Sequence, residues 1–221
     1  MSPGRQVCSG LAACGRLLAV SSLLWSPGSR AFDWDLSESQ LEALRSGEIL
    51  VDADVDRDRN RGDVRAAVAI EAVRDVVYGA MTSCPTALTF VPHLRRCVVL
   101  ETAPDRSWQV IEHVVDLGWY LPGTRYVIRA EYDPGRSVRF QHLRGDLSDN
   151  SGLWELRPAP GWDATIVTYR VRVVPRFYVP QWLIRRSLKQ ELPALLEALR
   201  RHSEAAHGSL EMELTRPAAP A

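Results

Sequence analysis

The chain has 221 residues, of which 46% are hydrophobic and 24% charged, so it can bury a core, and global disorder is disfavoured. This length suits one domain. Lys+Arg and Asp+Glu both number 27, and a nucleic-acid-binding protein, which needs a basic excess on one surface, is therefore not expected.

The first 31 residues have the order of a secretory signal peptide. Arg5 and Arg16 precede a short apolar run at residues 17–25, and Ser29-Arg30-Ala31 offers small residues at the −3 and −1 positions of a cleavage site. The run is far shorter than the ~20 apolar residues of a membrane span. We therefore predict an exported protein, periplasmic or secreted; an uncleaved anchor or a mis-assigned start is the alternative.

A short helical segment and two strands are expected next. Within residues 32–46, Ser37 and Gln40 have the spacing of a capping box in front of a short helix. Alternating apolar residues then predict strands at residues 48–55 and 64–70, joined by a turn of mixed charge.

Two short helices follow, at residues 72–81 and 86–91, where apolar side chains recur at helical spacing. Cys84 lies in the turn between them, and Cys97 opens the next strand. Because these two environments differ, buried free thiols are favoured over a disulfide, although export would permit one.

Alternating runs separated by turn signals predict an antiparallel meander with one apolar and one solvated face. The expected strands cover residues 94–101, 108–117, 124–132, 138–142, 153–156 and 165–174. Residues 148–152, Ser-Asp-Asn-Ser-Gly, are expected to form a turn.

The last predicted element is a long helix. It starts near Pro180 and carries an apolar stripe from Trp182 to Leu199. Pro193 interrupts its backbone hydrogen bonds and should kink it near Lys189. Residues 204–221 have little apolar content, and we expect a disordered tail there.

Short motifs support this order of elements. They are Gly47-Glu48-Ile49-Leu50-Val51, Phe90-Val91-Pro92-His93-Leu94, Arg144-Gly145-Asp146, Gly152-x-Trp154-x-Leu156, and Thr168-Tyr169 followed by Val174-Pro175-Arg176-Phe177-Tyr178-Val179-Pro180. With them, residues 47–203 resemble the START / polyketide cyclase / coenzyme Q-binding (SRPBCC, Bet v 1-like) superfamily. The resemblance implies an α+β helix-grip fold, in which a curved antiparallel sheet wraps around the C-terminal helix. Members bind lipids, sterols, quinones and polyketides, and some are cyclases.

A cavity between sheet and helix would be lined by the inward side chains of both. The residues predicted to line it are Tyr126, Ile128, Phe140, His142, Trp154, Val167, Tyr169, Val171, Ile184 and Leu188. The aromatic loop Trp119-Tyr120-Leu121 could guard its mouth, touch a membrane surface transiently, or simply cap the core.

His113, Glu112 and Tyr169 are the candidates for proton transfer. A structural role is favoured for each: a buried neutral histidine with one hydrogen bond, a glutamate paired with an arginine of the next strand, and a packed tyrosine. His142 is interpreted in the same way as His113. Neither histidine has a Cys, Asp or Glu at metal-ligand spacing, so no metal site is expected, and no cofactor.

These features favour a monomeric protein that binds or transfers a lipid-, quinone- or isoprenoid-like molecule. A polyketide cyclase or aromatase using cavity Tyr, His and Glu side chains is an alternative. An envelope interaction protein with a filled core is another. The basic residues Arg185, Arg186 and Lys189 form a solvated helix face, or one that docks to anionic lipid headgroups.

Overall fold

The computed structural model describes residues 35–56, 58, 60–116 and 123–214. The predicted signal peptide and the loop Trp119-Tyr120-Leu121 lie outside the described residues. In chain order the elements are α1 (Glu38–Arg45), β1 (Leu50–Asp56), β2 (Arg61–Ile70), α2 (Arg74–Thr82), α3 (Cys84–Phe90), β3 (Leu94–Thr102), β4 (Trp108–Val115), β5 (Thr124–Asp133), β6 (Ser137–Gly145), β7 (Leu147–Pro158), β8 (Thr165–Pro175), α4 (Gln181–Arg186), a π-helical segment η1 (Ser187–Glu191) and α5 (Leu192–Leu214).

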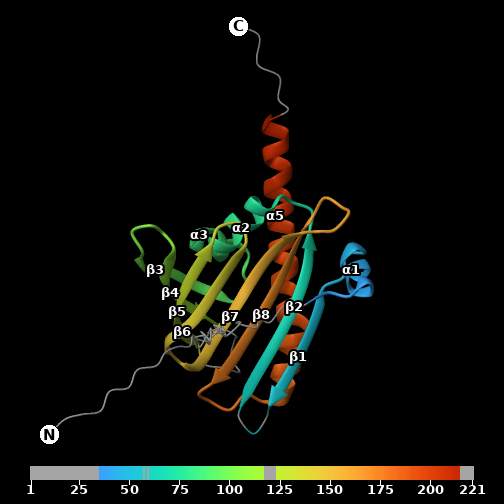
Figure 1. The fold of residues 1–221 in the computed structure, drawn as a ribbon. Coiled ribbons are helices and arrows are strands. Elements are labelled where there is room, and N and C mark those ends of the chain that lie inside the picture. Colours follow the sequence, from blue (N-terminus) through green and yellow to red (C-terminus); the bar gives the residue numbers. More distant parts are fainter. Residues whose placement is uncertain (1–34, 57, 59, 117–122, 215–221) are drawn as a thin grey trace, which may run out of the picture. The chain divides into compact units, whose positions relative to one another are not determined.

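The eight strands form one antiparallel sheet in the order β1-β2-β8-β7-β6-β5-β4-β3 (Figure 1). Strands β3 to β8 follow one another as a meander, and β2 pairs with β8, so the first strand pair extends the sheet beyond the last strand. The sheet stays open, with β1 and β3 at its edges. Together with the long C-terminal helix, this topology confirms the predicted α+β helix-grip fold.

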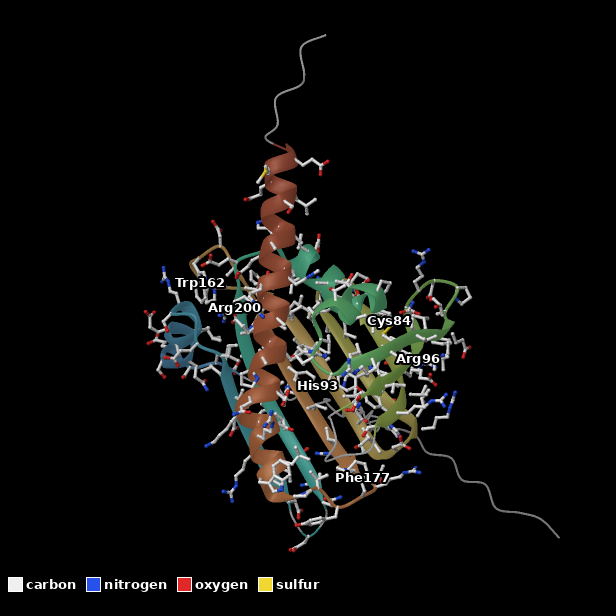
Figure 2. All side chains as sticks on the ribbon, turned by 180° about the vertical axis from the view of Figure 1, so that it is seen from behind. Cys84, His93, Arg96, Trp162, Phe177 and Arg200 are labelled. Carbon is white, nitrogen blue, oxygen red and sulfur yellow. A yellow bond between two sulfur atoms is a disulfide. The ribbon has the colours of Figure 1, made fainter. Side chains whose placement is uncertain are left out.

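Helix α5 lies across one face of the sheet, as Figure 2 shows. Its Leu196 and Leu199 are buried in a cluster with Val68 and Ile70 of β2 and Val77 of α2. Full burial of one such side chain stabilises the fold by about 2 kcal/mol. None of the helices in the described part of the chain is long and apolar enough to cross a membrane.

The opposite face of β2 is covered by α1, whose Leu44 is buried against Ala67, Ala69 and Ile166. The predicted capping box is present at the start of α1: Ser37 Oγ accepts from the backbone N–H of Gln40, and the Gln40 side chain accepts from the Ser37 N–H. Since both faces of β2 are covered, the last five residues of the strand, 66–70, are all apolar and buried and do not alternate with polar ones.

Arg200 of α5, labelled in Figure 2, connects this helix to β2 and to the turn before β1 through hydrogen bonds. Its Nε donates to the carbonyl oxygen of Ala69 at 3.0 Å, and one terminal nitrogen donates to the carbonyl oxygen of Gly47, also at 3.0 Å. The helix is thereby tied both to β2 and to the turn between α1 and β1.

The C-terminal helix is interrupted where Pro193 predicts it. The chain changes from α4 to a π-helical turn at Ser187–Glu191, and α5 begins at Leu192. Proline has no N–H to donate to the carbonyl four residues earlier, so the regular ladder cannot pass through this position.

Two local expectations were wrong. Residues 148–152 are not a turn but part of β7, where Asn150 pairs with Val173 and Gly152 with Val171 of β8. Backbone pairing with β8 overrides the local preference of this polar segment for a turn. The tail is helical up to Leu214. Among its described residues, this end of the helix has no buried face. Its successive turns are connected by the pair His207–Glu211 and by the hydrogen bond from Ser209 Oγ to the Ala205 carbonyl oxygen.

Gly152 occupies a position that has no room for a side chain. A Cβ atom there would lie 2.3 Å from the Arg170 carbonyl oxygen and 2.5 Å from the Phe140 ring. We expect Gly152→Ala to lower the free energy of unfolding by about 2 kcal/mol, because the backbone oxygen cannot move aside without straining β8. Urea denaturation followed by circular dichroism measures this change.

The matched control is Gly208→Ala in α5, where a Cβ would meet no atom within 4 Å. Helix propensity alone should leave this variant unchanged in stability, or stabilise it by up to ~1 kcal/mol. Equal effects of the two substitutions would contradict the steric account of Gly152.

Candidate functional site

A cavity of about 240 Å³ lies between the sheet, the helix pair α2–α3 and helix α5. Strand alternation explains which side chains reach it: Tyr126, Ile128, Ala130 and Tyr132 occur at every second position of β5, and all four line the cavity. Helix α5 contributes Leu195 and Leu199, and α2 and α3 contribute a further wall that includes Met81, Cys84 and Phe90.

The described lining residues include no Asp, Glu, Lys or Arg. Burial lowers the pKa of His113 to about 4, so its imidazole is neutral at pH 7. Burial likewise raises the pKa of Tyr126 to about 12. The pKa of Tyr169 is raised by burial and, secondarily, by the charge that Tyr126 would carry. The site therefore offers neutral hydrogen-bonding groups, with Asn150 as a further one, and no described charge.

An aromatic wall stands on one side of the cavity. The rings of Trp154 and Tyr169 stack with centroids 3.9 Å apart, and Phe140 and Tyr169 lie 6.3 Å apart. The sheet register causes this arrangement, because Trp154 is directly opposite Tyr169 on the neighbouring strand. His113 and Tyr126, which also line the cavity, form a T-shaped pair with ring centroids 5.4 Å apart.

A second, more open hollow of about 260 Å³ adjoins the first and shares Val91, Tyr169 and Leu195 with it. His93 and Glu191 border it, and His93 Nε2 lies 2.8 Å from Glu191 Oε2. This contact joins the turn before β3 to the π-helical segment, and Figure 2 shows His93 beside the C-terminal helix.

The structure brings together most of the residues predicted to face a cavity. Those that line the first cavity are Tyr126, Ile128, Phe140, Trp154 and Tyr169, and those that line the second are Tyr169, Val171 and Leu188. Val167, Ile184 and His142 line neither of the two. Val167 is fully buried in the core under α5. Contact of these residues with a ligand stays a prediction.

His142 differs from the expectation of one hydrogen bond. Both of its ring nitrogens are buried, and neither has a hydrogen-bond partner among the described residues. Its backbone N–H donates to Ser151 Oγ at 3.4 Å.

Glu112, a candidate for proton transfer, does not reach the cavity. It alternates with His113 along β4 and lies on the other face of the sheet, where its carboxylate contacts Arg125 and Arg96. Arg125 Nε donates to Glu112 Oε2 at 2.7 Å, and Glu112 is only 3% exposed. Glu112 therefore forms a structural ion pair, whereas His113 and Tyr169 line the same cavity.

Cys84 and Cys97 form a disulfide with their Cα atoms 5.3 Å apart, so the expectation of two free thiols was wrong. Cys97 lies directly opposite His113 in the β3–β4 pairing, and both cysteines line the cavity. The two sulfur atoms and one ring nitrogen of His113 all lie within 4.8 Å of one another. Sequence spacing did not reveal this cluster; the register of the β3–β4 hairpin would have been the signal for the Cys97–His113 half of it.

Comparison with known proteins agrees with this architecture. Residues 70–200 match the family described as "Polyketide cyclase / dehydrase and lipid transport". No curated protein matches the chain.

Solved structures share the fold. A STAR-related lipid transfer protein from Xanthomonas axonopodis is 21% identical, with a TM-score of 0.59 over 70% of this chain and 93% of its own. Human StAR-related lipid transfer protein 5 is 11% identical, with a TM-score of 0.60 over 73% and 84%. The di-domain aromatase/cyclase StfQ of the steffimycin biosynthetic pathway is 15% identical, with a TM-score of 0.54 over 71% and 54%. At these identities the likeness establishes the fold alone.

The buried tyrosine of the aromatic wall predicts a loss of stability in alkali. The folded-state pKa of Tyr169 is raised above its ordinary value of 10.0, so the unfolded chain releases the proton first and stability falls as the pH rises beyond 10. Between about pH 8 and about pH 11, the free energy of unfolding should fall in both proteins. We expect the fall to be roughly 1 kcal/mol smaller in Tyr169→Phe than in the unmodified protein.

Chemical denaturation of both proteins at the two pH values measures the difference. An identical alkaline loss in the two proteins would show that Tyr169 ionises as easily in the folded state as in the unfolded chain.

Proposed function

This chain belongs to the polyketide cyclase/dehydrase and lipid transport family, and from that premise we propose that it binds and transfers a neutral, largely apolar small molecule of the lipid, quinone or isoprenoid type. The observation that carries the proposal is a cavity whose described lining holds no charged side chain. An apolar ligand gains about 25 cal/mol for each Å² removed from water, so such a wall supplies affinity without charge pairing.

The polar groups at the wall suit one polar end of such a ligand. Tyr126 and Tyr169 are protonated at neutral pH, since the ordinary pKa of tyrosine is 10.0 and burial raises the pKa of each further. A protonated hydroxyl can donate to a carbonyl or ether oxygen. Asn150 can donate or accept in the same cavity. A ligand with a carbonyl or hydroxyl group on a hydrocarbon body fits this distribution.

Size limits the ligand. About 240 Å³ is below the range of cavities that enclose drug-sized molecules, so the first cavity alone suits a compact ligand body. The adjoining hollow, beyond Val91, Tyr169 and Leu195, extends the space for a chain. The His93–Glu191 contact borders that extension. The two side chains would have to move apart for a ligand to pass between them.

A cyclase or aromatase is the second candidate, because His113, Tyr126 and Tyr169 line one cavity. A neutral imidazole can accept a proton, and tyrosine hydroxyls can donate hydrogen bonds to a developing oxyanion. The carrier is favoured because Glu112 is turned to the other face of the sheet and no described cationic group reaches the cavity.

The proposed carrier acts as a monomer outside the cytoplasm. The disulfide between Cys84 and Cys97 supports that location, because such bonds persist mainly in oxidising compartments. Transient membrane contact during ligand exchange belongs to the same proposal, with Arg185, Arg186 and Lys189 as the basic helix face.

Purification of the protein from its natural source, followed by native mass spectrometry and organic extraction, tests the proposal. We expect a co-purifying neutral lipid, quinone or isoprenoid. A protein that is empty and also takes up no apolar fluorescent probe would contradict the carrier function.

Filling the cavity should weaken the binding of an apolar molecule. Ala130 lines the cavity and is 3% exposed, so Ala130→Leu places three additional carbons in the ligand space. We expect at least about 10-fold weaker binding of an apolar probe, equivalent to the ~1.4 kcal/mol of a decade in Kd. Ala205→Leu, at an exposed position of α5, adds the same carbons outside the cavity and should bind as the unmodified protein does. Equal affinities in the two variants would place the ligand elsewhere.

A further inference from the structure

We propose that Cys84, Cys97 and His113 form a Zn²⁺ site on the cavity wall when the disulfide between the cysteines is reduced. This proposal goes beyond carriage of an apolar molecule and does not depend on it. The structure holds the oxidised state, in which the two sulfurs are bonded to each other.

The fold brings the three donors together from three elements. Cys84 is the first residue of α3, Cys97 lies in β3, and His113 lies opposite Cys97 in β4. Two sulfurs and a ring nitrogen lie within 4.8 Å of one another, and once reduction breaks the bond between the sulfurs, three donors this close can surround one small cation. Among the described residues, this is the only cluster of three or more Cys, His, Asp or Glu side chains that could hold a metal ion.

The supporting structure should keep the donors close after reduction. Strand pairing fixes Cys97 against His113, and the edge contact with Tyr126 orients the imidazole. Ser83 holds the start of α3, because its Oγ accepts from the Thr86 N–H at 3.3 Å. The Cα atoms of the cysteines lie 5.3 Å apart, so each thiol needs only a side-chain rotation to separate from the other.

The donor set selects the class of cation. Two thiolates and an imidazole are the ligands that Zn²⁺ takes in tetrahedral sites, and they disfavour Mg²⁺ and Ca²⁺, which prefer oxygen. All three donors line the cavity, so the fourth position of a tetrahedron would be open to it. A water molecule or an oxygen atom of the cavity ligand can fill that position.

Oxidation and metal binding exclude each other in this arrangement. A dithiol reductant transfers two electrons and two protons to the disulfide and is itself converted to a disulfide, which leaves two cysteine thiols. Zn²⁺ then replaces the two thiol protons, which are released to solvent. In the oxidised protein neither sulfur is available as a thiolate.

Titration of the mature protein with Co²⁺ and Zn²⁺ tests the site. After reduction with a phosphine under anaerobic conditions, we expect one Co²⁺ per chain, with a thiolate-to-cobalt charge-transfer band and the visible bands of tetrahedral cobalt. Zn²⁺ should displace the cobalt and remove both. The oxidised protein should show neither band.

Variants separate this site from adventitious binding. Cys97→Ser should lose the charge-transfer band. His113→Ala should weaken binding at least ~10-fold, the loss that even an outer partner of a metal ligand causes. It retains the disulfide, so its folding can be verified in the oxidised state. His207→Ala, which removes an imidazole from the distal end of α5, should bind as the unmodified protein does.

A reduced, folded protein that binds no Co²⁺ would overturn the proposal, as would unchanged affinity in His113→Ala or a disulfide that resists the phosphine in the native state. Uptake of an apolar probe by the oxidised protein is measured separately, so failure of the metal site and failure of the carrier function are distinguishable.

Discussion

The C-terminal helix is much narrower than the sheet on which it packs, and the position of the cavity follows from this difference in width. Eight strands about 4.8 Å apart span ~34 Å, whereas an α-helix with its side chains is about 10–12 Å wide. Helix α5 therefore covers only part of the face, where Leu196 and Leu199 pack on β2 and α2. The remaining part, over β4 to β6, faces the short helices α2 and α3, and the cavity lies in the space that these elements leave between them.

Strand alternation keeps this space neutral. Along β8, Tyr169 and Val171 turn towards the helix side, whereas Arg170 and Arg172 lie on the outer face, with Glu155 and Asp63 as partners. Along β4 the same rule separates His113 from Glu112. A charge that is buried without a partner is costly, and the charged side chains of these strands lie on the outer face, where they form ion pairs. The polar groups of the described cavity wall are therefore hydroxyls, an amide and a neutral imidazole. The proposed carriage of an uncharged molecule rests on this neutral wall.

The cavity wall also contains a disulfide that joins two elements of the fold. The Cys84–Cys97 disulfide joins α3 to the edge strand β3, at the side of the sheet that α5 does not reach. An edge strand is paired on one side only, so this link gives β3 a second attachment beside its pairing with β4. In the reduced state, the proposed cation would join the same two elements and β4 through coordination bonds.

The sequence by itself determined the kinds of element, their order, and the faces of most strands. The capping box at Ser37, the period of two along β5 and the stripe of α5 are local patterns, and the structure keeps them. Pro193 marked the interruption of the last helix for an equally local reason. Those patterns, together with the resemblance of residues 47–203 to a known superfamily, predicted the helix-grip fold and several inward-facing residues.

Only the tertiary structure decided what depends on partners far away in the chain. Residues 148–152 became a strand because β8 supplied their hydrogen bonds, against the local preference for a turn. Cys84, Cys97 and His113 met because the β3–β4 register and the docking of α3 brought them together. A side chain's face follows from its neighbours in sequence, but its contacts follow from register and packing, which no single segment encodes.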